Sequence, residues 1–144
     1  ENDGLRRWLI NQTGVIGTTQ RAVVEMIASY GMAVGAEVFE TCVWIGRFIE
    51  HLPGDTELVK RQPVKLHHCH SPRATDANVR QALVDRFAKG VRNHGKGTKA
   101  EPGWFYGFNA DVWQAAALAV YAADQLTTLT TTTATATTSP TETN

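Results

Sequence analysis

Short apolar runs and segments with helical periodicity follow one another along this chain. Leu5 to Asn11 predicts a short helix, and the β-branched run Ala22 to Ile27 predicts a buried strand. From residue 33 to residue 52, apolar positions recur at spacings of three and four, which predicts a long helix. That helix ends at Pro53, and Glu57 to Lys60 is a candidate second strand.

The second half predicts two further helices around an irregular segment. The loop Ser71 to Asp76 ends in a helix start, and the following helix runs to about Ala88. Residues 90–109 show no periodicity, and an apolar helix then runs from Asp111 to Asp124. These elements predict one α/β domain over residues 1–126. Residues 127–144 contain eleven Thr, and we expect a disordered tail there.

Two acids stand out against their apolar surroundings. Glu25 lies inside the predicted strand, where an ionised carboxylate needs a cation or another partner. Asp111 opens the last predicted helix. A metal site would explain both acids. Alternatively, Asp111 caps its helix, and Glu25 lies in solvent at a strand end or pairs with Arg21.

Charge is distributed unevenly, although the net charge is zero. Residues 1–59 carry −4, residues 60–99 carry +8 and residues 100–144 carry −4. The central block therefore suits a phosphate backbone. An ordinary solvated face, neutralised by its acidic flanks, is the alternative. The ten basic residues are Lys60, Arg61, Lys65, Arg73, Arg80, Arg86, Lys89, Arg92, Lys96 and Lys99.

The irregular segment combines three bases with the consecutive aromatics Trp104, Phe105 and Tyr106. A mobile loop of this composition suits a nucleic-acid substrate. The alternative is a flexible connector whose aromatic side chains pack on the core.

Cysteine and histidine positions offer a weaker signal. Cys42 fits a small core residue, whereas the run from His67 to His70, with Cys69, suggests zinc. No second Cys or Cys/His pair accompanies that run, so zinc is a minor alternative. The chain has no recognisable signal peptide and no run of about 18 apolar residues. We therefore expect a reduced cytoplasmic setting and no membrane partner.

Three blocks in unbroken order carry a family resemblance. They are Val23 to Gly35 (VVEMIASYGMAVG), Ser71 to Ala74 with Asp76 to Phe87, and Pro102 to Gly107 with Asp111 to Trp113. Together with Thr41, Gly46-Arg47 and Val64-Lys65-Leu66-His67, they resemble the phage-type RuvC-like Holliday-junction resolvases over about residues 20–125.

The resemblance implies an RNase H-like mixed sheet flanked by helices, incomplete at the N-terminus. It implies two-metal phosphodiester hydrolysis of branched DNA, with Glu25 and Asp111 as catalytic metal ligands. The cations would be Mg²⁺ or Mn²⁺. A homodimer acting on a four-way junction, in the cytoplasm of a bacterial or phage-infected cell, would be the working form. The residues expected to contact the junction backbone are Arg61, Lys65, Arg73, Lys96 and Lys99.

The chain departs from the family pattern at two places. The family's first catalytic Asp, on the opening strand of the sheet, has no counterpart, because Asp3 lies in a polar start without an apolar run. Gln114 stands where bacterial relatives often place another acid. We therefore expect a fragment that is inactive alone. A non-catalytic nucleic-acid-binding module and a zinc-binding interaction protein are the alternative functions.

Overall fold

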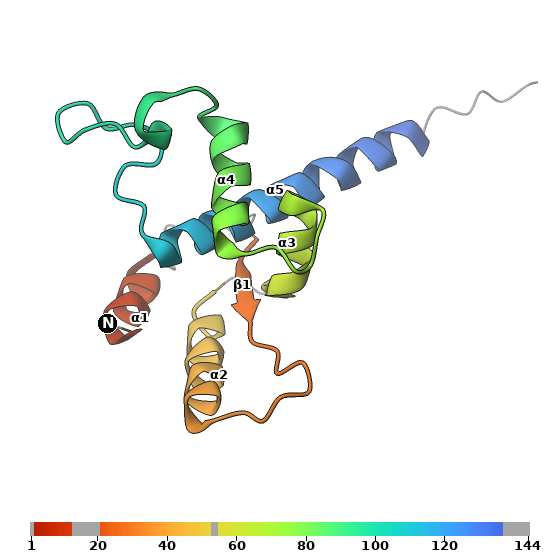
Figure 1. The fold of residues 1–144 in the computed structure, drawn as a ribbon. Coiled ribbons are helices and arrows are strands. Elements are labelled where there is room, and N and C mark those ends of the chain that lie inside the picture. The colour runs from red at the N-terminus through yellow and green to blue at the C-terminus, as the bar shows by residue number, and fades with distance from the viewer. Residues whose placement is uncertain (1, 13–20, 53–54, 137–144) are drawn as a thin grey trace, which may run out of the picture. The chain divides into compact units, whose positions relative to one another are not determined.

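The computed structural model describes residues 2–12, 21–52 and 55–136, which form a mixed α/β structure dominated by helices (Figure 1). The chain divides into two compact units, Glu1–Leu66 and His67–Asn144, here named the first and second units. The predicted domain of residues 1–126 includes all of the first unit and most of the second. The α/β class is confirmed, and the RNase H-like sheet stays a prediction.

The first unit contains a parallel pair of strands joined by a helical crossover. It comprises α1 (Asn2–Gln12), β1 (Val23–Met26), α2 (Ala36–Ile49), β2 (Glu57–Lys60) and the start of α3 (Arg61–Cys69). In register, Val23 pairs with Glu57 and Met26 with Lys60. Parallel strands need such a crossover because the end of one strand and the start of the next lie at opposite ends of the sheet. Among the described residues, β1 and β2 make up the whole sheet.

Helix α2 follows the predicted apolar stripe, although it is shorter than residues 33–52. Ile45 is buried, while Val38, Cys42 and Ile49 are half-buried. Helix α3 was not predicted as an element. Its Pro63 lies in the first helical turn, where no intrahelical amide donor is needed, so proline is compatible with the helix.

The second unit is built on α4 (Asp76–Phe87) and α5 (Ala110–Ala136), which pack against each other. Thr75 caps α4 in a capping box with Asn78, which confirms the predicted helix start within one residue. The unit's core joins both helices to the connecting segment. Its buried hydrophobic residues are Ala74, Val79, Leu83, Val84, Ala88, Phe105, Trp113, Ala117 and Leu118.

The segment between α4 and α5 is ordered by backbone contacts, whereas the sequence suggested a mobile or flexible loop. It includes the short 3₁₀ helix η1 (Arg92–Gly95). The amide N–H groups of Gly103 and Phe105 donate to the carbonyls of Lys96 and Gly95, both at 3.0 Å. A Cβ at Gly95 would lie 2.5 Å from the Ala88 Cβ, so glycine permits this close approach.

Helix α5 continues ten residues into the segment predicted to be a disordered tail. The Thr127 and Thr128 hydroxyls donate to the carbonyls of Ala123 and Asp124, at 3.1 and 3.0 Å. Extending an existing helix costs less than starting one, which explains why residues 127–136 can continue α5. The disordered tail stays a prediction. Residues 137–144 lie outside the described residues.

No helix in the described ranges is both long and apolar enough to cross a membrane.

Candidate nucleic-acid interface

Glu25, the first predicted metal ligand, lies on β1 with its side chain partly exposed. Its Oε1 atom is 3.6 Å from Nη1 of Arg61, the residue that directly follows β2. The alternative pairing with Arg21 is wrong, because Arg21 pairs with Glu57 instead. The parallel register explains both contacts, since it places the two ends of β1 beside the matching ends of β2. Arg61, predicted to contact DNA, is therefore also the cation next to Glu25.

Asp111, the second predicted ligand, is exposed in the first turn of α5. The residue that caps this helix is Asn109, whose Oδ1 accepts the Val112 amide N–H at 3.2 Å. Capping therefore does not account for Asp111, and that alternative is wrong. A carboxylate in a first helical turn is favoured by the helix dipole, which is a modest effect at an exposed position.

Glu25 belongs to the first unit and Asp111 to the second. Within the described ranges, no group of three or more His, Cys, Asp and Glu side chains could hold a metal ion. The carboxylate oxygens of Glu25 and Asp111 are nevertheless the ligand type that Mg²⁺ and Mn²⁺ prefer. The paired metal site stays a prediction.

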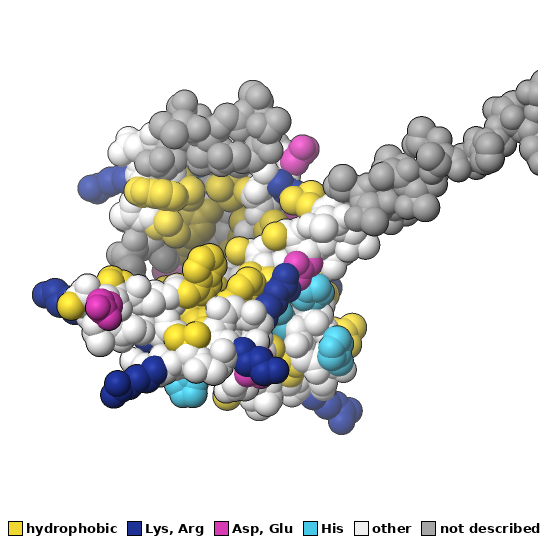
Figure 2. Space-filling view, turned by 90° about the horizontal axis from the view of Figure 1, so that it is seen from above, with side chains coloured by type: hydrophobic (Ala, Val, Ile, Leu, Met, Phe, Trp, Pro, Cys, Tyr) yellow, Lys and Arg dark blue, Asp and Glu magenta, His cyan; other side chains and the backbone are white. Residues whose placement is uncertain are grey.

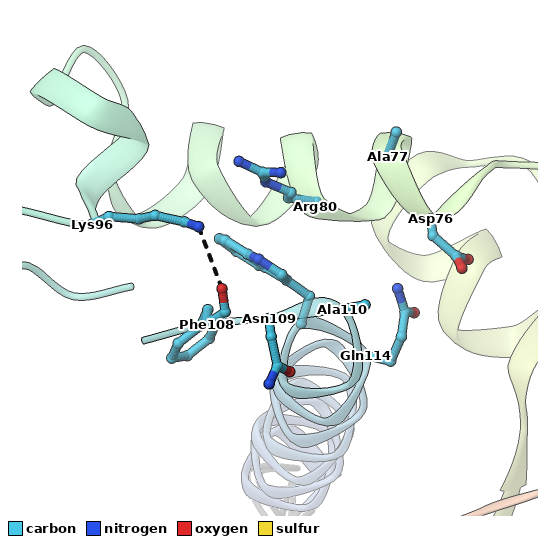
Figure 3. Close-up of a pocket in the computed structure, with 9 residues that line it drawn as sticks. Asp76, Ala77, Arg80, Lys96, Phe108, Asn109, Ala110 and Gln114 are labelled. Atoms are coloured by element: carbon cyan, nitrogen blue, oxygen red, sulfur yellow. Dashed lines mark hydrogen bonds between the residues drawn. The ribbon is translucent and has the colours of Figure 1, made fainter. Parts of the chain in front are cut away.

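A cavity of about 380 Å³ lies at the start of α5, between this helix and α4, and is here named the α5 cavity (Figure 3). Arg80 reaches it from α4 and Lys96 from the connecting segment. The Arg80 guanidinium lies 5.3 Å from the centre of the buried Trp113 ring, and Lys96 Nζ donates to the Phe108 carbonyl at 3.4 Å. The lining residues are Asp76, Ala77, Arg80, Lys96, Phe108, Asn109, Ala110, Trp113 and Gln114.

These contacts hold the positively charged side chains of Arg80 and Lys96 at the start of α5. The aromatic ring and the carbonyl orient Arg80 and Lys96 without neutralising them, because neither partner carries a net charge. Asp111 directly follows Ala110, a lining residue, on the same helical turn. An anion in the cavity would therefore meet the positive charges of Arg80 and Lys96 and also the carboxylate of Asp76, which lines the cavity.

The predicted DNA contacts are divided between the two units. Arg61 and Lys65 lie on α3 within the first unit, whereas Arg73, Lys96 and Lys99 lie in the second. Of these five residues, Lys96 lines the α5 cavity, and Arg73 and Lys99 are exposed elsewhere in the second unit.

Arg80 was missed as a site residue, although it belongs to the basic block. Its position four residues after Asp76 places both residues on one face of α4, and that spacing is the signal that could have identified it.

The three consecutive aromatics have different surroundings. Phe105 is 1% exposed and contacts Trp113 and Phe108, with ring centres 4.5 and 5.3 Å away. Trp104 and Tyr106 are 70% and 46% exposed. The sequence offered a substrate loop or a core-packing connector as alternatives, and the segment combines features of both. Its middle aromatic anchors the segment while the outer two face solvent.

The histidine run connects α3 to α5. His67 Nε2 donates to Asp124 Oδ2 at 2.7 Å, and His68 Nε2 donates to the Ala117 carbonyl at 2.8 Å. Arg86 also contacts both Asp124 oxygens, at 2.6 and 2.8 Å. Hydrogen bonds from Arg86, and secondarily from His67, hold the pKa of Asp124 well below its usual value. These contacts pack His67 and His68 against α5. The zinc alternative stays a prediction.

No family model, curated protein or solved structure matches this chain.

Proposed function

We propose that this chain is part of a metal-dependent endonuclease for branched DNA. In this proposal, Glu25 and Asp111 hold Mg²⁺ or Mn²⁺ in an RNase H-like site, and the basic residues bind the phosphate backbone. The bound cations would supply charge stabilisation for phosphodiester hydrolysis. A homodimer would engage the two-fold arrangement of a four-way junction.

The observation that carries the proposal is the start of α5. Two oriented cations, Arg80 and Lys96, line a cavity there, and Asp111 lies on the same helical turn. Cations alone would serve any anion, but Asp76 also lines the cavity, and the carboxylate of Asp111 on the first turn of α5 would repel a phosphate bound near it. A divalent cation between the carboxylate and the phosphate would remove that repulsion, which is why a nuclease site explains the arrangement better than a simple anion site does.

A second candidate function is DNA binding without cleavage. The pairing of Glu25 with Arg61 at 3.6 Å favours it, because a carboxylate that neutralises a neighbouring arginine needs no metal ion. Both functions require backbone binding. They differ only in whether divalent cations act at Asp111.

The first experiment measures backbone binding by the full chain. Binding to a synthetic four-way junction is titrated in NaCl, without divalent cations, for the wild-type chain and for Lys96→Ala. We expect Lys96→Ala to weaken binding and to reduce the slope of log K against log salt by about one, as for one lost phosphate contact. Arg47→Ala is the control, because Arg47 is an exposed cation on α2 in the first unit that does not line the α5 cavity. A flat salt response would contradict both functions.

The second experiment separates the two functions at Asp111. Junction binding is repeated with Mg²⁺ or Mn²⁺, comparing Asp111→Asn with Asp85→Asn, an exposed acid on α4. For the nuclease, we expect the cations to tighten wild-type binding, and Asp111→Asn to abolish that gain. Any Mg²⁺-dependent cleavage should disappear with it. If both variants respond to the cations like the wild-type chain, Asp111 is not a metal ligand and the binding module is favoured.

A further inference from the structure

Trp104 has the most exposed aromatic side chain in the described part of the chain, at 70%. Its indole ring lies against Phe87 of α4, with ring centres 6.0 Å apart and planes inclined by 19°. Phe87 itself is 39% exposed. The pair is therefore a stacked aromatic surface that solvent reaches.

Trp104 is not needed to anchor the connecting segment to the core. The neighbouring Phe105 already does so, since it is 1% exposed against Trp113. The backbone on both sides of Trp104 is held by hydrogen bonds from the amides of Gly103 and Phe105 to the preceding part of the segment, at 3.0 Å. The fold thus holds a large apolar ring in a fixed, solvent-facing position, which requires little ordering when a ligand binds.

The stacked pair also lines a cavity of about 740 Å³, here named the Trp104 cavity. Its walls combine the two aromatic rings with hydrogen-bonding side chains of Asn93 and Thr98 and with the cation of Arg92. Figure 2 shows hydrophobic and basic side chains reaching the same surface of the molecule. A flat heterocyclic ring with polar edges fits such walls.

Charge around the cavity favours an anionic ligand. Arg92 lines it, and the exposed Lys89 and Lys99 are each one residue away from a lining residue along the chain. Glu101 is the acidic lining residue. Positive groups around an exposed aromatic surface are the arrangement by which proteins bind single-stranded nucleic acid, because every base has a face that can stack.

We propose that Trp104, stacked on Phe87, is a platform for an unpaired base of DNA, with Arg92 and the neighbouring lysines facing its backbone. This inference rests on the proposed DNA-binding function and adds its substrate class, which is DNA with unstacked bases. The platform lines a different cavity from Arg80 and Lys96, so the two sites can be altered separately.

The test compares Trp104→Ala with the wild-type full chain on three probes: oligodeoxythymidine, a four-way junction with unpaired thymidines at its centre, and a blunt duplex. One stacked base is worth about 5- to 150-fold in affinity. We expect Trp104→Ala to lose about ten-fold or more on the first two probes and less than two-fold on the duplex. Trp104→Phe should retain most of the binding, because it keeps an aromatic face.

Trp8→Ala is the matched control, since Trp8 is 56% exposed on α1 in the first unit. It should bind all three probes like the wild-type chain. Circular dichroism of each variant checks that the fold is retained, and sedimentation checks the oligomeric state.

The outcomes separate the platform from the proposed function. If the wild-type chain binds duplex and junction but Trp104→Ala weakens all probes equally or none, the platform is wrong and backbone binding stands. A change in oligomeric state without a change in DNA binding would make Trp104 an interface between copies, which also overturns the platform. If the wild-type chain binds no DNA at all, both the proposed function and the platform are wrong.

Discussion

The two units differ in how completely they bury their hydrophobic residues. In the second unit, Val79, Leu83 and Phe105 are each 1% exposed. Among the described residues of the first unit, the most buried is Val59 at 4%. The first unit also leaves many large hydrophobic side chains exposed, namely Leu5, Trp8, Ile10, Tyr30, Met32, Val34, Phe39, Val43, Leu58 and Leu66.

The contrast follows from the kind of secondary structure in each unit. Helices α4 and α5 share a continuous core, closed by Phe105 from the connecting segment. The first unit instead depends on a parallel strand pair, and every residue of β1 is only half-buried. Parallel sheets are usually covered on both faces, and two strands alone are marginally stable in water. We therefore expect the second unit to be the more stable part of the chain.

The largest loss of stability is expected from removing a buried side chain in the second unit's core. Phe105→Ala should lower the free energy of unfolding by about 3–5 kcal/mol, because it removes a fully buried ring. Val59→Ala, in β2, should cost about 2 kcal/mol at roughly 0.8 kcal/mol per buried CH₂. Urea unfolding of the full chain measures both changes, and amide hydrogen exchange shows which unit loses protection. A larger cost for Val59→Ala would reverse the comparison between the units.

The next largest loss of stability is expected from breaking an ion pair, and one pair in each unit can be compared. Asp124→Asn removes the carboxylate on which Arg86 and His67 converge, and should cost about 1.5–3 kcal/mol because charge-assisted hydrogen bonds are lost. Glu57→Gln, which breaks the pair with Arg21 in the first unit, should cost less than about 1 kcal/mol because both side chains are more exposed. Thermal unfolding at neutral pH measures both variants.

The contribution of Asp124 to the free energy of unfolding should also depend on pH in a defined direction. The pKa of Asp124 is lowered in the folded chain from its usual 3.8, so its stabilising effect is present above about pH 4 and is lost as the pH falls further. The difference in stability between the wild-type chain and Asp124→Asn should therefore shrink in acid. A constant difference down to pH 2 would contradict the lowered pKa.

The smallest expected effect is the titration of His68. Burial lowers the pKa of His68 below its usual 6.5, and this outweighs the hydrogen bond to the Ala117 carbonyl, which acts in the opposite direction. Below pH 6.5 the unfolded chain takes up this proton more readily, so stability should decline as the pH falls. His68→Gln should remove that part of the pH dependence, as measured by urea unfolding between pH 5 and 8. Identical pH profiles would exclude His68 as the cause.

Local patterns in the sequence predicted most of the elements. The spacing of apolar residues identified α2 and α4, and the β-branched run identified β1. These features depend on neighbouring residues, so they can be recognised without a structure. Helix α3 was missed because Pro63 and the histidine run conceal its periodicity. The helical part of the Thr-rich segment was missed because its backbone continues a helix that begins seventeen residues earlier.

The contacts within the candidate site could not be predicted from local sequence patterns. The sequence identified Glu25, Asp111 and Lys96 as residues of interest, but the pairing of Glu25 with Arg61 follows from the strand register. Arg80 reaches the α5 cavity only because α4 packs against the start of α5. Such contacts join residues far apart in the chain, and no local spacing specifies them.

The sequence by itself determined the elements, the uneven charge and the identity of the chemically capable side chains, because these depend on composition and near neighbours. The tertiary structure alone decided which of the consecutive aromatics is buried. Phe105 is enclosed because Gly95 and Gly103 allow two backbone segments to approach closely, and that approach leaves Trp104 in solvent beside Phe87. Burial is a property of the packed chain, so two aromatic residues at adjacent positions can serve opposite roles.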